Sequence, residues 1–265
     1  MAKTAAMTAP LLLTRSGPIG TLTLNRPDKR NALTKAMWQA LPTVLAEAEA
    51  DRELLVLIVR GQGDHFAAGA DIAEFPETYA TLESSREYSD AVQAAGRALA
   101  AFPKPTIAAV RGACVGGGCG LALACDLRFA SAEARLGITP GKLGLAYSLG
   151  DTKRLVDAVG PSRAKDILFS GRLVEANEAL AIGLVDRVFA IDAFEAELQA
   201  YAEGLTRVSQ YSARTMKATI NAIVGGQDAE TPASYEAYLE CFQSDDFKEG
   251  YAAFLAKRSP TFRFR

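Results

Sequence analysis

The chain has 265 residues, of which 49% are hydrophobic and 23% charged, and its formal net charge is −2. This is the balance of a globular protein with a sizeable core, and so small a charge gives no broad attraction to nucleic acid or to an anionic membrane. A single histidine excludes a zinc site built from several histidines. The four cysteines have no CxxC spacing and argue against a disulfide framework, so we expect reduced thiols and a cytoplasmic location.

The first half of the chain alternates strand and helix patterns. Residues 11–15 and 19–24 are predicted to be strands on either side of a short turn. Thr34 is a suitable N-cap for a helix that reaches about residue 51. The run LLVLIVRG (54–61) is typical of a strand buried on both faces. After a loop, apolar residues at helical spacing predict a helix over residues 82–102.

A second unit of strand, glycine turn and helix occupies the middle of the chain. The segment KPTIAAVRG (104–112) predicts another buried strand, and it leads into the glycine cluster VGGGCGLALACD (115–126). We expect an α/β core over residues 1–195 and a helical C-terminal region over 196–265. The remaining patterns predict two short strands within 127–138, helices over 151–158, 162–169 and 176–182, a short strand over 184–189, and helices beyond about 195.

The glycine cluster does not fit a phosphate-binding loop. In a GxGxxG motif the third glycine would fall on Leu121, and the nearest match to a P-loop, GITPGK (137–142), is one residue short. Glycines before a helix also expose backbone N–H groups, and two such loops facing each other would form an oxyanion hole. The other interpretation is that Gly116, Gly117 and Gly118 only allow a strand and a helix to pack closely, and the spacing leaves both interpretations open.

Six stretches, in this order, resemble the crotonase superfamily, which is the enoyl-CoA hydratase/isomerase family. The resemblance covers nearly the whole chain. It implies an α/β fold, a crotonase-like spiral of ββα units with a helical C-terminal oligomerisation region, assembled as a homotrimer or a dimer of trimers. The stretches are NRPDKRNAL (25–33), HFAAGADI (65–72), KPTIAAVRGACVGGGCGLALACDLRFAS (104–131), LGL (143–145), EALAIGLVDRV (178–188) and FLAKRSPTF (254–262).

The resemblance also implies a site. Enzymes of this family stabilise a thioester enolate, and the matching oxyanion donors are the backbone N–H groups of Ala70 and Gly117. The substrate is then an acyl-CoA thioester, and no further cofactor and no metal are implied. The residues that match the family's coenzyme A contacts are Ala68, Asp71 and Ile72 in the first loop, the basic residues Lys29 and Arg30, and Lys257 and Arg258 reaching the site from a neighbouring subunit.

Three positions that carry acids in related enzymes carry none here. Family hydratases use two glutamates at the positions of Gly120 and Pro140, and other members use an acid at the position of Ser148. The segment 138–155 instead resembles the family's methylmalonyl-CoA decarboxylases, whose pattern TPxxLGxxYxL makes Tyr147 the substrate-contacting side chain. Loss of carbon dioxide from a malonyl-type thioester yields an enolate without a base. The favoured interpretation is therefore decarboxylation of a short malonyl-type CoA thioester.

Two other functions stay open at this point. An isomerase or hydratase could take its acid from residues 74–90, although Glu83, Glu87 and Asp90 share one helix face of the kind that is usually solvated. A non-catalytic paralogue would bind acyl-CoA without turning it over.

Four polar residues near these motifs have a less definite role. His65 and Asp126 are interpreted as structural residues of a loop and of a helix end. Lys142 and Asp151 flank Tyr147 and could reach the same pocket, but their spacing does not place them.

Overall fold

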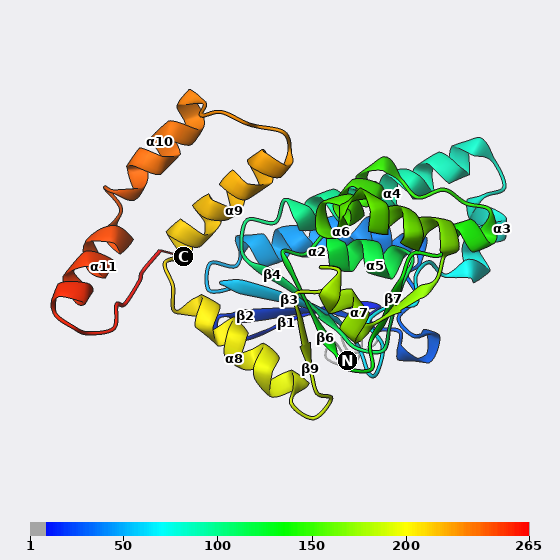
Figure 1. Cartoon of the computed structure of the whole chain (residues 1–265), viewed down its shortest axis with the longest axis horizontal. Helices are drawn as coiled ribbons and strands as arrows, with labels where there is room; N and C mark the ends of the chain where they lie inside the picture. The colour runs from blue at the N-terminus through cyan, green and yellow to red at the C-terminus, as the bar shows by residue number, and fades with distance from the viewer. Residues whose placement is uncertain (1–8, 265) are drawn as a thin grey trace.

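Figure 1 shows the computed structural model of the chain, which describes residues 9–264. Its larger sheet has the strand order β1-β2-β3-β4-β6-β9, in which β1 and β2 are antiparallel and each later pair is parallel. A smaller sheet has the order β5-β7-β8. The larger sheet comprises β1 (Leu11–Ser16), β2 (Ile19–Leu24), β3 (Val56–Gly61), β4 (Thr106–Val110), β6 (Leu127–Ser131) and β9 (Arg187–Phe189), and the smaller one β5 (Ala113–Val115), β7 (Arg135–Gly137) and β8 (Leu173–Glu175).

Helices follow most of these strands and make up the C-terminal part of the described chain. No helix within residues 9–264 is both long and apolar enough to cross a lipid bilayer. The 3-10 helices are η1 (Pro27–Lys29), η2 (Ile72–Glu74) and η3 (Pro140–Leu143). The α-helices are α2 (Lys35–Ala50), α3 (Phe75–Thr78), α4 (Leu82–Ala100), α5 (Gly117–Leu123), α6 (Leu149–Ser170), α7 (Ala176–Ala181), α8 (Phe194–Thr206), α9 (Gln210–Val224), α10 (Pro232–Cys241) and α11 (Asp245–Leu255).

The two faces of the larger sheet are covered by different helices. Leu57 and Val59 of β3 belong to the cluster that contains the buried side chains of α2 and α4, and these two helices pack against each other. Val56 and Ile58 of the same strand pack on the opposite face with Phe194 of α8. Successive side chains of a strand point to opposite faces. The expectation of a strand buried on both faces is therefore confirmed for β3.

Most element boundaries follow from local chemistry. The Thr34 side chain accepts a hydrogen bond from the Met37 N–H and caps α2, as expected. The two helices that the pattern predicts after residue 151 join in α6 across a break at Gly160, whose φ is 76° and which precedes Pro161. The sequence pattern does not predict β5 and β8, because three residues are too few to show a strand periodicity.

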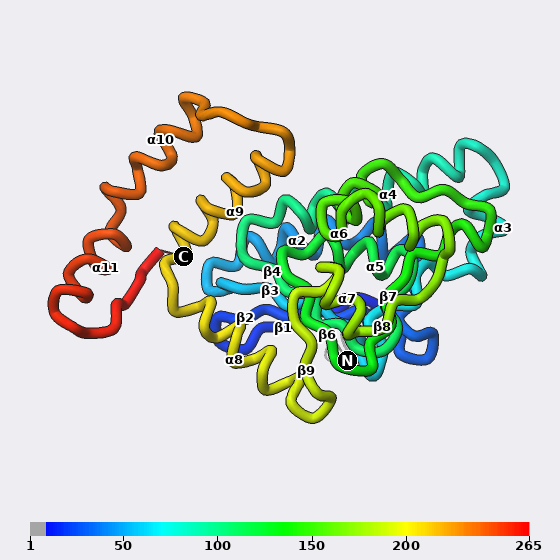
Figure 2. Tube along the Cα trace, viewed as in Figure 1, coloured from blue at the N-terminus to red at the C-terminus, as the bar shows by residue number. Residues whose placement is uncertain are grey.

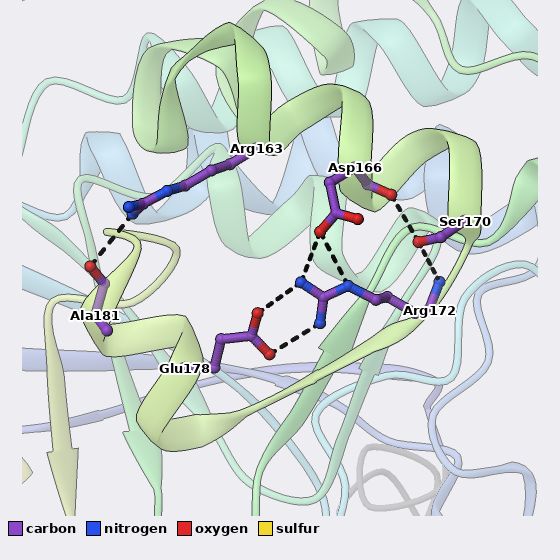
Figure 3. Close-up of polar contacts among 6 residues, drawn as sticks. All are labelled: Arg163, Asp166, Ser170, Arg172, Glu178 and Ala181. Carbon is purple, nitrogen blue, oxygen red and sulfur yellow. Dashed lines mark hydrogen bonds and ion pairs between the residues drawn. The ribbon is translucent and has the colours of Figure 1, made fainter.

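Figure 3 shows how the second half of α6 is joined to α7. Arg172, which lies between α6 and β8, donates to Asp166 Oδ2 from Nη2 at 2.7 Å and to Glu178 Oε2 from Nη1 at 2.8 Å. Arg163 adds a hydrogen bond from Nη1 to the carbonyl oxygen of Ala181 at 3.4 Å. A planar guanidinium that binds two carboxylates fixes both partners in direction as well as in distance. This bridge therefore holds α7 against the end of α6.

Helices α10 and α11 stand away from the larger sheet (Figure 2), and α9 joins them to the core through Lys217, whose Nζ binds Asp126 Oδ2 at 2.7 Å. Large apolar side chains are exposed on all three, among them Ile220 and Ile223 of α9, Tyr238 of α10 and Phe254 of α11. Exposed apolar surface of this extent is typical of an assembly interface. The homotrimer or dimer of trimers stays a prediction.

Lys104 is a charged side chain with only 2% of its surface exposed. Its Nζ donates to the carbonyl oxygens of Ala48, Glu49 and Asp51 at 3.0, 2.9 and 2.7 Å. The last carbonyl groups of an α-helix have no partner within the helix. The Lys104 side chain therefore caps the C-terminus of α2 and ties this helix to the entrance of β4.

Replacing this cap should destabilise the fold. We expect Lys104→Met to lower the free energy of unfolding by about 2 kcal/mol or more, because each buried carbonyl left without a donor costs about 1–3 kcal/mol. Denaturant titration followed by circular dichroism measures the change. Lys165→Met, at an exposed position of α6, is the matched control and should change stability by less than about 0.5 kcal/mol. Equal unfolding midpoints for the two variants would contradict the capping role.

Candidate functional site

A pocket of about 210 Å³ opens beside the N-terminus of α5. Its wall consists of the loop 68–72 beyond β3, parts of α3 and α4, the first residues of α5, and the segment 139–151 that leads into α6. Segments from both strand–glycine–helix units thus meet at one place. The aromatic side chains of the wall are Trp38, Phe75, Tyr79, Tyr88 and Tyr147.

The backbone of Ala70 faces this pocket. Ala70 pairs with Leu33 in a parallel bridge, in which the Leu33 N–H donates to the Gly69 carbonyl at 2.8 Å and the Asp71 N–H donates to the Leu33 carbonyl at 2.9 Å. The N–H of Ala70 itself points to the side away from Leu33, because the amides of a strand alternate in direction. Within residues 9–264 this N–H has no acceptor, so it is available to a ligand.

The second amide belongs to Gly117, the first residue of α5. Gly116 precedes it with a φ of 54°, a conformation that favours glycine, and donates its own N–H to the Gly137 carbonyl at 2.8 Å. In the described part of the chain the Gly117 N–H has no acceptor. A β-carbon built on Gly117 would lie 4.0 Å from the Ala70 nitrogen, and one built on Gly69 would lie 3.7 Å from the Gly117 nitrogen. The two unpartnered amides therefore lie side by side.

The glycine cluster also allows close packing. A β-carbon on Gly118 would lie 2.6 Å from the Ala67 carbonyl oxygen, and one on Gly117 would lie 2.9 Å from Cζ2 of Trp38. A real β-carbon does not approach other atoms so closely, so α5 can approach the first loop only without these side chains. Close packing therefore requires glycine at positions 117 and 118, and the same approach brings the amides of Ala70 and Gly117 together, as an oxyanion hole requires.

Tyr147 lies in the pocket wall, where its hydroxyl donates to the Gly116 carbonyl at 3.2 Å. Burial and the neighbouring Asp151 carboxylate raise the pKa of this hydroxyl well above its ordinary value. The tyrosine is therefore a neutral hydrogen-bonding group. Thus the structure brings the three predicted catalytic positions, Ala70, Gly117 and Tyr147, to one pocket.

Asp151 supplies the carboxylate of the pocket wall, and no other acidic side chain within residues 9–264 lines it. Its Oδ1 accepts from Arg154 Nη2 at 2.5 Å, and its Oδ2 accepts from Ser148 Oγ at 2.7 Å. The sequence spacing of Ser148 and Asp151 is that of a helix cap, and the Asp151 N–H does donate to Ser148 Oγ. Because a helix cap already explains this spacing, the sequence does not indicate that Asp151 belongs to the pocket wall.

Two of the loop residues matched to coenzyme A contacts, Ala68 and Ile72, lie in the pocket wall. The Ala68 N–H donates to the Arg30 carbonyl at 2.9 Å, which places Arg30 beside this loop. The side chains of Lys29 and Arg30 are exposed at the end of η1. An exposed basic pair next to the pocket edge is suited to the phosphates of a bound coenzyme.

Asp71 has a local structural role in this loop. Its Oδ1 accepts from the Ala73 N–H at 3.2 Å and caps η2, while its Oδ2 pairs with Nη2 of Arg26 at 2.8 Å. The hydrogen bond from Arg26 is the main reason that the pKa of this carboxyl lies below its ordinary value. Asp71 thus orders the loop that carries Ala70, and it does not belong to the pocket wall.

Within one chain, Lys257 does not come near the pocket. It follows the end of α11, which lies at the opposite end of the molecule from α3 in Figure 1. Arg258 donates from Nη1 and Nη2 to the carboxylate of Glu249 at 2.6 and 2.8 Å. A contact of Lys257 with coenzyme A therefore requires a second subunit.

The acidic residues considered in the segment 74–90 lie outside the pocket wall. Glu87 Oε2 pairs with Lys35 Nζ at 2.8 Å, and Glu74 accepts from the Lys35 backbone N–H at 2.7 Å. Glu83 and Asp90 are exposed on α4. The expectation of an acid from this segment is therefore not met at this pocket, because the polar face of α4 points to solvent.

The remaining polar candidates are structural. His65 Nδ1 accepts from the Ala113 N–H at 3.1 Å, and Asp126 Oδ2 pairs with Lys217 Nζ at 2.7 Å. Lys142 lies against the turn after α6 and is not part of the pocket wall. Among the residues that the structure describes, no group of three or more His, Cys, Asp or Glu is arranged to hold a metal ion.

The chain is similar to known proteins over nearly its whole length. A family model for enoyl-CoA hydratase/isomerase matches residues 14–265. The chain is 36% identical over 252 residues to the short-chain-enoyl-CoA hydratase of Clostridium acetobutylicum, covering 94% of this chain and 95% of that protein. It is 35% identical over 254 residues to the crotonyl-CoA hydratase of Syntrophomonas wolfei, covering 95% and 97%. A crystal structure of an enoyl-CoA hydratase/isomerase family protein from Hyphomonas neptunium matches with a TM-score of 0.95 and 43% identity, over 98% of this chain and 100% of that one. The chain therefore has the crotonase fold and belongs to the enoyl-CoA hydratase/isomerase family.

Proposed function

We propose that this crotonase-family acyl-CoA enzyme acts on a short-chain enoyl-CoA, whose thioester oxygen accepts hydrogen bonds from the amides of Ala70 and Gly117. The observation that carries the proposal is the convergence, in a pocket rich in apolar groups, of two amides that have no acceptor in the described part of the chain. Negative charge that develops on the thioester oxygen is stabilised there, and one such donor typically lowers the barrier by about 3–4 kcal/mol.

Hydration is the first reaction to consider. The oxygen of water bonds to the β-carbon, the electrons of the carbon–carbon double bond move to the thioester oxygen, and the resulting enolate takes a proton at the α-carbon. The oxyanion hole binds the charged oxygen of this enolate more strongly than the neutral thioester oxygen of the ground state, so it accelerates the reaction. The names of the relatives from Clostridium acetobutylicum and Syntrophomonas wolfei, both hydratases, support this choice.

The size of the pocket supports a short acyl group. Its volume of about 210 Å³ compares with an apolar cavity of about 150 Å³ that binds benzene. There is room for a short acyl chain and a reacting water. The adenosine and phosphate part of the coenzyme would lie outside, where Lys29 and Arg30 are exposed.

Decarboxylation of a short malonyl-type thioester is the second candidate. Gly120 and Pro140, the two positions at which family hydratases carry glutamates, supply no carboxylate. These observations favour a reaction that needs no base. Cleavage of the carbon–carbon bond leaves its electron pair on the α-carbon, which gives the same enolate, and the neutral Tyr147 hydroxyl could orient the departing carboxylate.

One assay separates these reactions. Purified protein is incubated with crotonyl-CoA and with methylmalonyl-CoA, and the products are read by mass spectrometry. We expect crotonyl-CoA to gain the mass of one water molecule. Loss of carbon dioxide from methylmalonyl-CoA, with crotonyl-CoA unchanged, would establish the second candidate instead. Binding of both thioesters without turnover of either would indicate a non-catalytic acyl-CoA-binding protein.

A substitution at Gly117 tests the oxyanion hole. A β-carbon there would lie 2.9 Å from the Trp38 ring, so Gly117→Ala should shift the start of α5 and misalign the amide with that of Ala70. We expect kcat to fall at least about tenfold, as removal of a whole donor costs about 10²–10³. Gly150→Ala is the matched control, since its β-carbon would meet nothing within 4 Å. Equal kcat for both variants would remove the Gly117 amide from the proposed mechanism.

A further inference from the structure

We infer that Asp151 is the acid–base residue of this site and that Arg154 is its positioning residue. The inference rests on the enolate chemistry proposed above. Asp151 is 8% exposed, and within residues 9–264 it is the one acidic residue of the pocket wall. It reaches the pocket from α6, whereas the two candidate oxyanion amides come from the loop after β3 and from α5.

The surface of α5 leaves space for the Asp151 carboxylate. Gly120 lies three residues after Gly117, which is about 4.5 Å along the helix axis. A β-carbon on Gly120 would lie 3.3 Å from Asp151 Oδ1 and 2.5 Å from the Tyr147 hydroxyl oxygen. The carboxylate therefore packs against a bare part of α5, less than one helical turn from the amide that would hold the thioester oxygen.

A second glycine makes room for Arg154. A β-carbon on Gly96 of α4 would lie 2.8 Å from Nη2 of Arg154, the same nitrogen that donates to Asp151. Glycines on two different helices thus accommodate one ion pair of α6. Ser148 and Arg154 stand three residues before and after Asp151, so all three share one face of the helix.

The hydrogen bonds of Asp151 leave it able to accept a proton. Each carboxylate oxygen has two acceptor sites, and each here accepts one hydrogen bond, from Arg154 at Oδ1 and from Ser148 at Oδ2. The remaining sites can receive a proton from a ligand or from water in the pocket. Among the residues that the structure describes, the buried Nε of Arg154 has no hydrogen-bond partner, and Nη2 of the same guanidinium pairs with the Asp151 carboxylate.

One carboxylate is sufficient for the proposed hydration. Asp151 takes one proton from the water whose oxygen bonds to the β-carbon, while the double-bond electrons move to the thioester oxygen. The protonated Asp151 then gives that proton to the α-carbon, and the thioester carbonyl is restored. Water has been added across the double bond and the carboxylate is regenerated. A positioned acid–base group typically contributes about 10²–10⁴-fold in rate.

The test compares two aspartates of α6. Asp151→Asn keeps the size and the Ser148 contact, and it should lower kcat for crotonyl-CoA hydration by about 10²–10⁴-fold with little change in KM. Asp157→Asn is the matched control, since Asp157 pairs with Lys153 near the surface, and it should retain wild-type kcat. Asp151→Glu keeps a negative charge that can pair with Arg154, so this variant should keep the fold. It should still lose about tenfold or more in kcat, because the carboxylate is displaced by one methylene.

The outcomes distinguish this inference from the proposed function. If the wild-type chain hydrates crotonyl-CoA and Asp151→Asn does so equally well, the role of Asp151 is overturned and the proposed function stands. If both proteins decarboxylate methylmalonyl-CoA at equal rates, the base is unnecessary and the role is again overturned. If the wild-type chain transforms neither thioester, the proposed function fails and the inference fails with it.

Arg154 is tested by a pair of variants. Arg154→Met should lower kcat about tenfold or more with KM within about twofold, because the carboxylate loses the group that orients it for the transition state. Arg154→Lys keeps a cation and should recover most of that loss. A melting temperature that falls in Arg154→Met without any change in kcat would show a structural role only.

Discussion

The contact between the Ala67 carbonyl and Gly118 is the constraint on which the rest of the site depends. A side chain at Gly118 would collide with this carbonyl, and one at Gly117 would collide with Trp38. Glycine at both positions lets α5 begin directly against the loop that follows β3. Two amides that belong to different strand–helix units then lie side by side, as the proposed oxyanion hole requires. The pocket, its chemistry and the proposed substrate class all follow from this approach of one backbone to another.

The parallel sheet explains why these segments meet. Strands β3 and β4 run side by side in the same direction, so the loops that follow them leave from the same edge. The pairing continues beyond the sheet in the bridge between Ala67 and Cys114, which guides both loops toward the pocket. The segment before α6 closes the pocket from the other side, and it brings the polar groups that the glycine-rich helix lacks. The backbone N–H groups and the polar side chains of the pocket therefore come from separate parts of the fold.

Much of this could be predicted from the sequence, because it depends on local patterns. The buried run of β3, the Thr34 cap and the glycine cluster each predict their structure from a few adjacent residues. The position of Asp151 could not be predicted, since its spacing from Ser148 is that of an ordinary helix cap and its approach to Gly120 depends on the packing of α6 against α5. The acidic residues of α4 could be placed on one helix face from their spacing. The spacing does not show whether that face points to the pocket or to solvent, and in the structure it points to solvent.

The break in α6 at Gly160 divides this helix into two segments that make different contacts. The first segment carries the ion pair of Asp151 and Arg154, and the second is anchored to α7 through Arg172. In a continuous helix both segments would share one axis, so the direction of the outer end would fix the direction of the end at the pocket. Gly160, with a φ of 76°, followed by Pro161 interrupts the hydrogen-bond ladder, so the two segments are not one continuous helix. The direction of the outer segment is therefore set by its own anchor on α7, and the direction of the first segment by its contacts at the pocket.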